Sequence, residues 1–110
     1  MSFKIELVDL KDGHYALIVE CFDEEIVSKF NEMGYDGNGD TWFGITESIA
    51  RLTFGSISNQ ISHSPEADSE MAVSTNKKLL EKLGQEVERA FNDDVFLKKV
   101  IENANPDYLE

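Results

Sequence analysis

The chain opens with two segments in which apolar and polar side chains alternate, separated by a turn around Asp12-Gly13. Alternation with a period of two predicts β-strands. A two-residue turn would pair Leu7 with Ile18, whereas a three-residue loop ending with Gly13 in the left-handed conformation would pair Leu7 with Leu17. Only the second register gives one continuous apolar face, so it is the one predicted. The apolar members of the alternation are Phe3, Ile5, Leu7, Tyr15, Leu17, Val19 and Cys21.

The pattern then changes to helical spacing over two segments, about 24–33 and 41–54. Asp23 is the expected N-cap of the first helix, with Phe22 placed for a hydrophobic staple, and Gly34 ends that helix. Asp40 is the expected N-cap of the second helix, and Gly55 terminates it. The apolar positions expected to recur on the helices are Ile26, Phe30, Met33, Trp42, Ile45, Ile49 and Leu52.

Period-two alternation returns between Ser56 and Ser74. In its first part Ile57 and Ile61 alternate with polar residues, and in its second part Met71 and Val73 alternate with small or acidic ones. The segment 64–69 between them contains Pro65 and residues that favour turns. The pattern therefore predicts a second β-hairpin.

Two further helices are predicted in the last third of the chain. One of Ser74, Thr75 and Asn76 caps the first of them, and the second ends at Asn105-Pro106. Three consecutive capping residues over 92–94 favour a break between the helices over a single kinked helix. Residues 106–110 are expected to form a loose tail. The apolar positions of these helices are Leu79, Leu80, Leu83, Val87, Ala90, Phe91, Val95, Phe96, Val100 and Ile101.

The predicted order is ββααββαα within a single domain spanning residues 1–110. Two hairpins forming one antiparallel sheet of about four strands, packed with about four helices, make an α+β fold. A chain of 110 residues is long enough to bury a hydrophobic core of its own.

The composition limits the classes of binding partner that the chain suits. The chain has 22 acidic and 10 basic residues, for a formal net charge of −12. That charge argues against binding to nucleic acid or to an anionic membrane, because phosphates would be repelled. The negative charge favours a cationic partner, or it serves only to keep the protein soluble. One cysteine and the lack of a signal-like apolar run at the start predict a cytoplasmic protein without disulfides.

The sequence offers little catalytic chemistry. His14 is expected on the surface, and His63 is expected to be a structural histidine near Glu66 and Asp68 rather than a metal ligand. Cys21 is expected to be a buried, inert thiol, although a helix N-terminus nearby leaves a reactive role open. No cofactor-binding or metal-binding motif is recognisable. We therefore expect no catalytic residues, no cofactor and no metal.

The most distinctive stretch is the glycine loop, defined as residues 34–42. Its glycines reach left-handed conformations at low cost, so the loop is expected to be tight. It is either a connector between helices or a platform for a partner. A second loop over 64–69, followed by Glu70, carries further carboxylates, and the two loops together would form an acidic patch. The residues expected to contact a partner are Tyr35, Asp36, Asn38, Asp40, Glu66 and Asp68; those expected to shape the loops are Gly34, Gly37, Gly39, Trp42 and Pro65.

Two segments resemble a known family. Gly34-Tyr35-Asp36-Gly37-Asn38-Gly39, followed by Trp42, resembles the Gly-Tyr-Glu-Gly-Asn-Gly-x-x-Trp signature of a bacterial immunity-protein family, the one numbered fifty-one. Pro65-Glu66-Ala67 is similar to that family's Asp-Pro-Glu-Ala segment, with Ser64 in place of the acidic residue. The leucine-rich helix from about Asn76 continues the similarity.

The resemblance implies a small cytoplasmic α+β protein, encoded beside a polymorphic toxin, that binds and neutralises the cognate toxin without catalytic activity. A basic nuclease would suit the acidic balance of the chain, although acidity alone does not specify a nuclease. The alternative is a small ligand-binding or regulatory domain that uses a groove beside Trp42. The sequence does not give the identity of the toxin or the oligomeric state.

Overall fold

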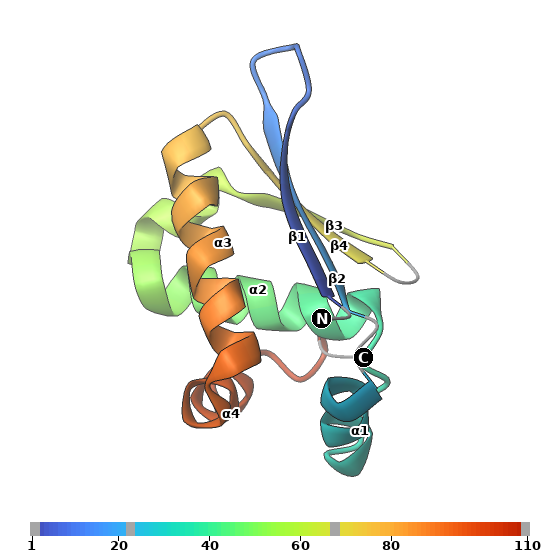
Figure 1. Ribbon diagram of the computed structural model, residues 1–110. Coiled ribbons are helices and arrows are strands. Elements are labelled where there is room, and N and C mark those ends of the chain that lie inside the picture. Colours follow the sequence, from blue (N-terminus) through green and yellow to red (C-terminus); the bar gives the residue numbers. More distant parts are fainter. Residues whose placement is uncertain (1–2, 22–23, 67–68, 109–110) are drawn as a thin grey trace.

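The structure is a computed structural model that describes residues 3–21, 24–66 and 69–108. Over these residues the chain forms four strands, four α-helices and one short 3-10 helix, in the predicted order ββααββαα (Figure 1). The elements are β1 (Phe3–Asp9), β2 (Tyr15–Cys21), α1 (Glu24–Glu32), α2 (Gly39–Phe54), η1 (Gly55–Gln60), β3 (Ser62–Pro65), β4 (Ser69–Ser74), α3 (Lys77–Asn92) and α4 (Asp94–Glu102).

The described strands form one antiparallel sheet in the order β1-β2-β4-β3. The two hairpins therefore meet through β2 and β4, the inner strands. Helices α2 and α3 pack on one face of this sheet, and α1 and α4 lie at the end opposite the β1–β2 turn (Figure 1). The predicted α+β class and the predicted single sheet are confirmed.

The first hairpin has the predicted register. Leu7 pairs with Leu17 and Ile5 with Val19, so the apolar face is continuous. Gly13 has a φ of +90°, as the three-residue loop requires. Lys11 also has a positive φ of 68°, and its backbone N–H donates to the Asp9 carboxylate at 2.8 Å. The alternation of apolar residues and the turn chemistry therefore determined this element.

The prediction for the first half of the second hairpin was wrong. Residues Gly55–Gln60 form the 3-10 helix η1, and the strand begins only at Ser62. Ile57, expected to face the core, is 49% exposed, whereas Ile61 is buried. The segment is rich in Ser, Gly and Asn, which have low β propensity, so two isoleucines do not suffice to keep it extended.

The two faces of β4 are also reversed relative to the hydrophobic pattern. Its pairing with β2 places Glu70 opposite the buried Val19 and places Met71 opposite Ile18. Glu70, with Ala72 and Ser74, is therefore buried against the helices, while Met71 and Val73 face the other side. Register with the neighbouring strand decides which side a residue faces, and it prevails over the polarity of the side chain.

The helices end largely where capping chemistry predicts. Asn76 caps α3 by accepting from the N–H of Leu79, and Asp93 caps α4 by accepting from the N–H of Phe96. The break between α3 and α4 is thereby confirmed. The predicted N-cap Asp23 and its staple partner Phe22 lie outside the described residues.

Most of the core positions predicted on the helices are buried, but three are exposed. Met33 lies beyond the end of α1, Leu52 lies in the last turn of α2 and Val95 lies in the first turn of α4. Their exposed fractions are 47%, 43% and 81%. Helical spacing identifies an apolar stripe but does not show where the neighbouring element ends, so terminal positions are the ones it misplaces.

Candidate functional site

The glycine loop begins with a tight helix end. Gly34 has a φ of +90°, and its N–H donates to the carbonyl of Asn31 at 3.0 Å. The N–H of Tyr35 donates to the carbonyl of Phe30 at 2.9 Å. This pair of bonds is the Schellman arrangement, and it confirms Gly34 as the residue that ends α1.

The N-cap of α2 is Asn38, not Asp40 as predicted. The carboxamide oxygen of Asn38 accepts from the N–H of Thr41 at 3.2 Å, and the backbone of Asn38 is extended. The Thr41 hydroxyl in turn accepts from the N–H of Gly37 at 3.0 Å. Asp40 lies in the first turn of α2, where its charge complements the helix dipole. The Asn38 side chain therefore serves the loop's own structure.

Gly39 brings the two loops together. A methyl group at this position would overlap the backbone carbonyl oxygens of Glu66 and Ser69. Only glycine allows α2 to begin so close to the turn between β3 and β4 (Figure 1). Gly37, at a φ of +73°, lies against Val27 of α1, although less closely. The glycine loop thus contacts both α1 and the second turn.

Trp42 anchors the loop from inside the core. Its ring stacks on Phe91 with the centroids 4.6 Å apart and meets the edge of Phe30 at 5.3 Å. The side chain is fully buried, and its indole Nε1 has no hydrogen-bond partner among the described residues. Trp42 therefore presents no surface to a small ligand, in contrast to the alternative that placed a binding groove beside it.

The predicted contact residues differ in accessibility. Asp36 and Glu66 are exposed, while Tyr35, Asn38 and Asp40 are half-buried. Asp68 lies outside the described residues. Pro65 ends β3, and the N–H of Glu66 donates to the carbonyl of Ser69 at 2.7 Å, which closes the second turn.

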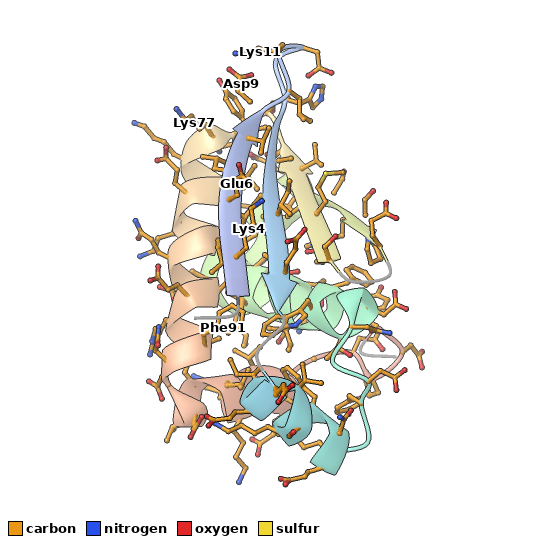
Figure 2. All side chains as sticks on the ribbon, turned by 45° about the vertical axis from the view of Figure 1, so that its right-hand side comes forward. Lys4, Glu6, Asp9, Lys11, Lys77 and Phe91 are labelled. Carbon is orange, nitrogen blue, oxygen red and sulfur yellow. The ribbon has the colours of Figure 1, made fainter. Side chains whose placement is uncertain are left out.

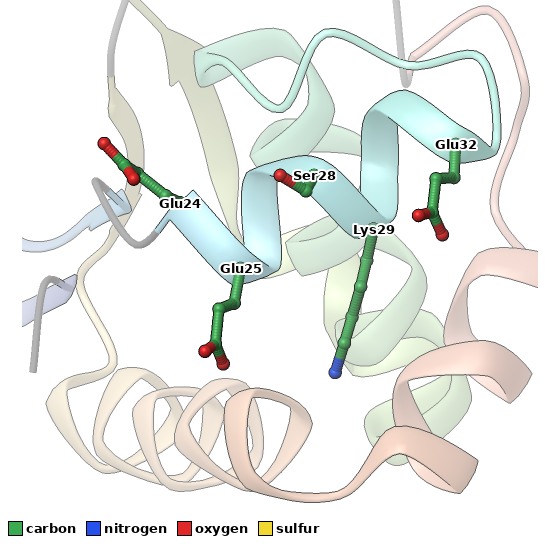
Figure 3. A pocket seen from close by; sticks show the side chains of 5 residues that line it. All are labelled: Glu24, Glu25, Ser28, Lys29 and Glu32. Atoms are coloured by element: carbon green, nitrogen blue, oxygen red, sulfur yellow. The ribbon is translucent and has the colours of Figure 1, made fainter.

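Helix α1 carries further carboxylates, on a surface distinct from that of the glycine loop. A hollow of about 470 Å³ lies along the helix, lined by residues of α1 (Figure 3). Lys29 lines the same hollow, and its ammonium donates to the Asp94 carboxylate of α4 at 2.7 Å. Gly37 lies against Val27, whereas Glu25, Lys29 and Glu32 point to the other side of α1, toward α4, so the hollow is a separate surface (Figure 3). The glycine loop and the second turn, which meet at Gly39, form the surface here named the acidic end. Its acidic residues, among those described, are Asp36, Asp40 and Glu66.

A buried polar cluster holds the second hairpin against α2. Oε2 of Glu70 accepts a hydrogen bond from the Thr46 hydroxyl, and Nδ1 of His63 lies 3.1 Å from the same oxygen. Glu70 and Thr46 are fully buried, and Oε1 of Glu70 has no partner among the described residues. His63 is thus a structural histidine, as predicted, but it is paired with Glu70 and not with Glu66. Glu70 does not belong to the surface patch.

We expect Glu70→Ala to lower the free energy of unfolding by about 2–4 kcal/mol, because it leaves a cavity and removes the buried partner of the His63 ring. The Thr46 hydroxyl retains an acceptor, the carbonyl of Phe43 at 3.2 Å. Chemical denaturation measures this change. Glu81→Ala, at an exposed position on α3, serves as the control and should change stability by less than about 0.5 kcal/mol. Equal stability of the two variants would show that the cluster does not stabilise the fold.

The described part of the chain gives little support for a function other than binding. No group of three or more His, Cys, Asp and Glu side chains there is arranged to hold a metal ion. The side chain of Cys21 lies outside the described set. None of the helices in the described ranges combines the length and the apolarity needed to cross a membrane.

Comparison with known proteins gives one match. The sequence model of the family described as immunity protein 51 matches residues 5–106. No curated protein and no solved structure matches the chain. The matched span includes the glycine loop and the turn between β3 and β4, which together form the acidic end.

Proposed function

Because the chain belongs to the immunity protein 51 family, we propose that it binds and neutralises a cognate bacterial toxin through its acidic end. The observation that carries the proposal is the contact of Gly39 with the backbone of Glu66 and Ser69, since it joins two carboxylate-bearing loops into one surface. Both segments that resemble the family lie at this contact.

The acidic end suits a basic protein. Exposed carboxylates on rigid loops accept charge-assisted hydrogen bonds from Arg and Lys side chains and accelerate association with a cationic partner. The net charge of −12 acts in the same direction and opposes binding to nucleic acid. The proposed partner is therefore a basic toxin domain, such as a nuclease, which the protein would block by binding alone, without a cofactor or catalysis of its own.

Neutralisation of this kind takes place where the toxin acts, so we propose a cytoplasmic location. The test is co-expression in a bacterial host with the toxin encoded beside this gene. We expect the wild-type chain to restore growth and to co-purify with the toxin domain. Growth arrest that persists despite soluble expression of the chain, together with the absence of a complex, would overturn the proposal.

A further inference from the structure

The face of the sheet that turns away from α2 and α3 carries a cluster of apolar side chains. Register places Val8 opposite Ala16, Ala16 opposite Val73, and Ile18 opposite Met71. Alternation along each strand directs all five to the same face. We name these residues, which span three adjacent strands, the apolar patch.

Described helices do not cover the apolar patch. The buried core includes Leu17, Val19 and Ala72 from the opposite face, but none of the patch residues. Val8, Ile18, Met71 and Val73 are half-buried, and only the small Ala16 side chain is fully enclosed by its neighbours. An uncovered apolar cluster on a sheet face is typical of a surface that binds another protein.

Charged residues border the patch. Lys4 and Glu6 project from the same face of β1 and form an ion pair at 2.8 Å (Figure 2). The hydrogen bond to Glu6 raises the pKa of the Lys4 ammonium, and the negative charges of Glu6 and Glu20 add to this effect. Glu20 lies opposite Lys4 on one side and opposite Ser69 on the other.

Ser69 connects this border to the acidic end. It follows the second turn directly, and its carbonyl oxygen lies against Gly39 of the glycine loop. The row Lys4, Glu20, Ser69 thus leads from the open face of the sheet to the loops proposed to contact the toxin. A partner that covers the acidic end needs to extend only past this row to reach Ile18 and Met71.

We infer that the apolar patch is the central part of the toxin interface and that the acidic end is its charged border. The inference rests on the proposed function and names a second surface for it. Protein interfaces combine a desolvated apolar centre with a polar rim, and most of the binding energy comes from the centre. A second copy of this chain is a poor occupant, because each copy carries a net charge of −12. A cationic toxin domain presents the opposite charge to the border.

The test uses substitutions that remove apolar surface without changing charge. The variant Met71→Gln/Val73→Thr retains the approximate size and the β propensity of the two side chains. We expect its dissociation constant for the purified, catalytically inactivated toxin domain to rise at least about tenfold, mainly through faster dissociation. The matched control is Ile57→Gln/Val95→Thr, which alters two exposed apolar residues of η1 and α4, away from the sheet face. We expect the control to bind as the wild type does.

Methyl NMR of the wild-type complex provides a reading that does not depend on any substitution. The ε-methyl signal of Met71 and the δ1-methyl signal of Ile18 should shift when the toxin domain is added, while that of the buried Ile49 should not. Unchanged Met71 and Ile18 signals in a formed complex would overturn the inference and leave the proposed function intact. A wild-type chain that does not bind the toxin would overturn both. Self-association of the wild type that the patch variant abolishes would assign the patch to a second copy and so overturn the inference.

Discussion

Gly39→Ala should destabilise the protein by about 3 kcal/mol. Its Cβ would overlap the backbone carbonyls of Glu66 and Ser69, and backbone cannot move aside as a flexible side chain can. The start of α2 and the second turn would have to separate. Chemical denaturation followed by Trp42 fluorescence measures the loss, since Trp42 lies in the first turn of α2 and is fully buried.

Gly13→Ala is the matched control for this substitution. Gly13 has a φ of +90° but open space around its Cα, so alanine there costs only the left-handed conformation, about 1 kcal/mol. Gly39 does not have a positive φ, so only its contact with the backbone of Glu66 and Ser69 excludes a side chain there. If Gly39→Ala is no less stable than Gly13→Ala, the two loops are not in the close contact described here.

Local chemistry in the sequence was sufficient for much of the fold. The register of the first hairpin followed from the requirement that Leu7 and Leu17 share an apolar face, and it was correct. The break before α4 followed from Asp93, which does cap that helix. These features depend on residues close in sequence or on a single periodic pattern, which is why the sequence predicted them.

Features set by distant contacts were missed. The alternation on β4 does not show which face is buried, and the buried face carries Glu70, which contacts Thr46 of α2 and His63 of β3 in the interior. Asn38 and Asp40 are both good capping residues, two positions apart. Asn38 is the cap, and the next residue, Gly39, lies against the second turn. That contact links distant parts of the chain, so the local sequence does not show it.

The candidate site was predicted only in part. The sequence identified exposed carboxylates in each loop, Asp36 and Glu66, but it did not show that the two loops are in contact. The two loops meet because Gly39 lies against the backbone of Glu66 and Ser69, a contact that periodicity does not reveal. The sequence did not reveal the open face of the sheet, because that face depends on which side of β4 packs against the helices.

Charge reversal at the acidic end is the second large effect that we expect. Asp36→Lys/Glu66→Lys should weaken binding of the toxin domain by about 10- to 100-fold at low ionic strength, because a basic partner is then repelled where it was attracted. Both side chains are exposed, so the free energy of unfolding should stay within about 0.5 kcal/mol of the wild type. In co-expression, the variant should give weaker protection against the toxin.

Glu81→Lys/Glu88→Lys is the control for net charge. Both residues are exposed on α3, which packs on the opposite face of the sheet from the apolar patch, and the pair changes the charge of the chain by the same amount. This variant should bind more weakly only through the general loss of negative charge, an effect that salt removes. If the acidic end binds the toxin domain specifically, the two variants will have different dissociation constants for it.

The most direct measurement is a calorimetric titration of the purified, inactivated toxin domain into the wild type and these two variants, at low and at physiological ionic strength. We predict tight binding by the wild type and a dissociation constant for the α3 variant that approaches the wild-type value at physiological ionic strength. For Asp36→Lys/Glu66→Lys we predict a dissociation constant at least about tenfold higher than that of the wild type at both salt concentrations. Equal dissociation constants for the two variants would contradict the assignment of the acidic end as the toxin-binding surface.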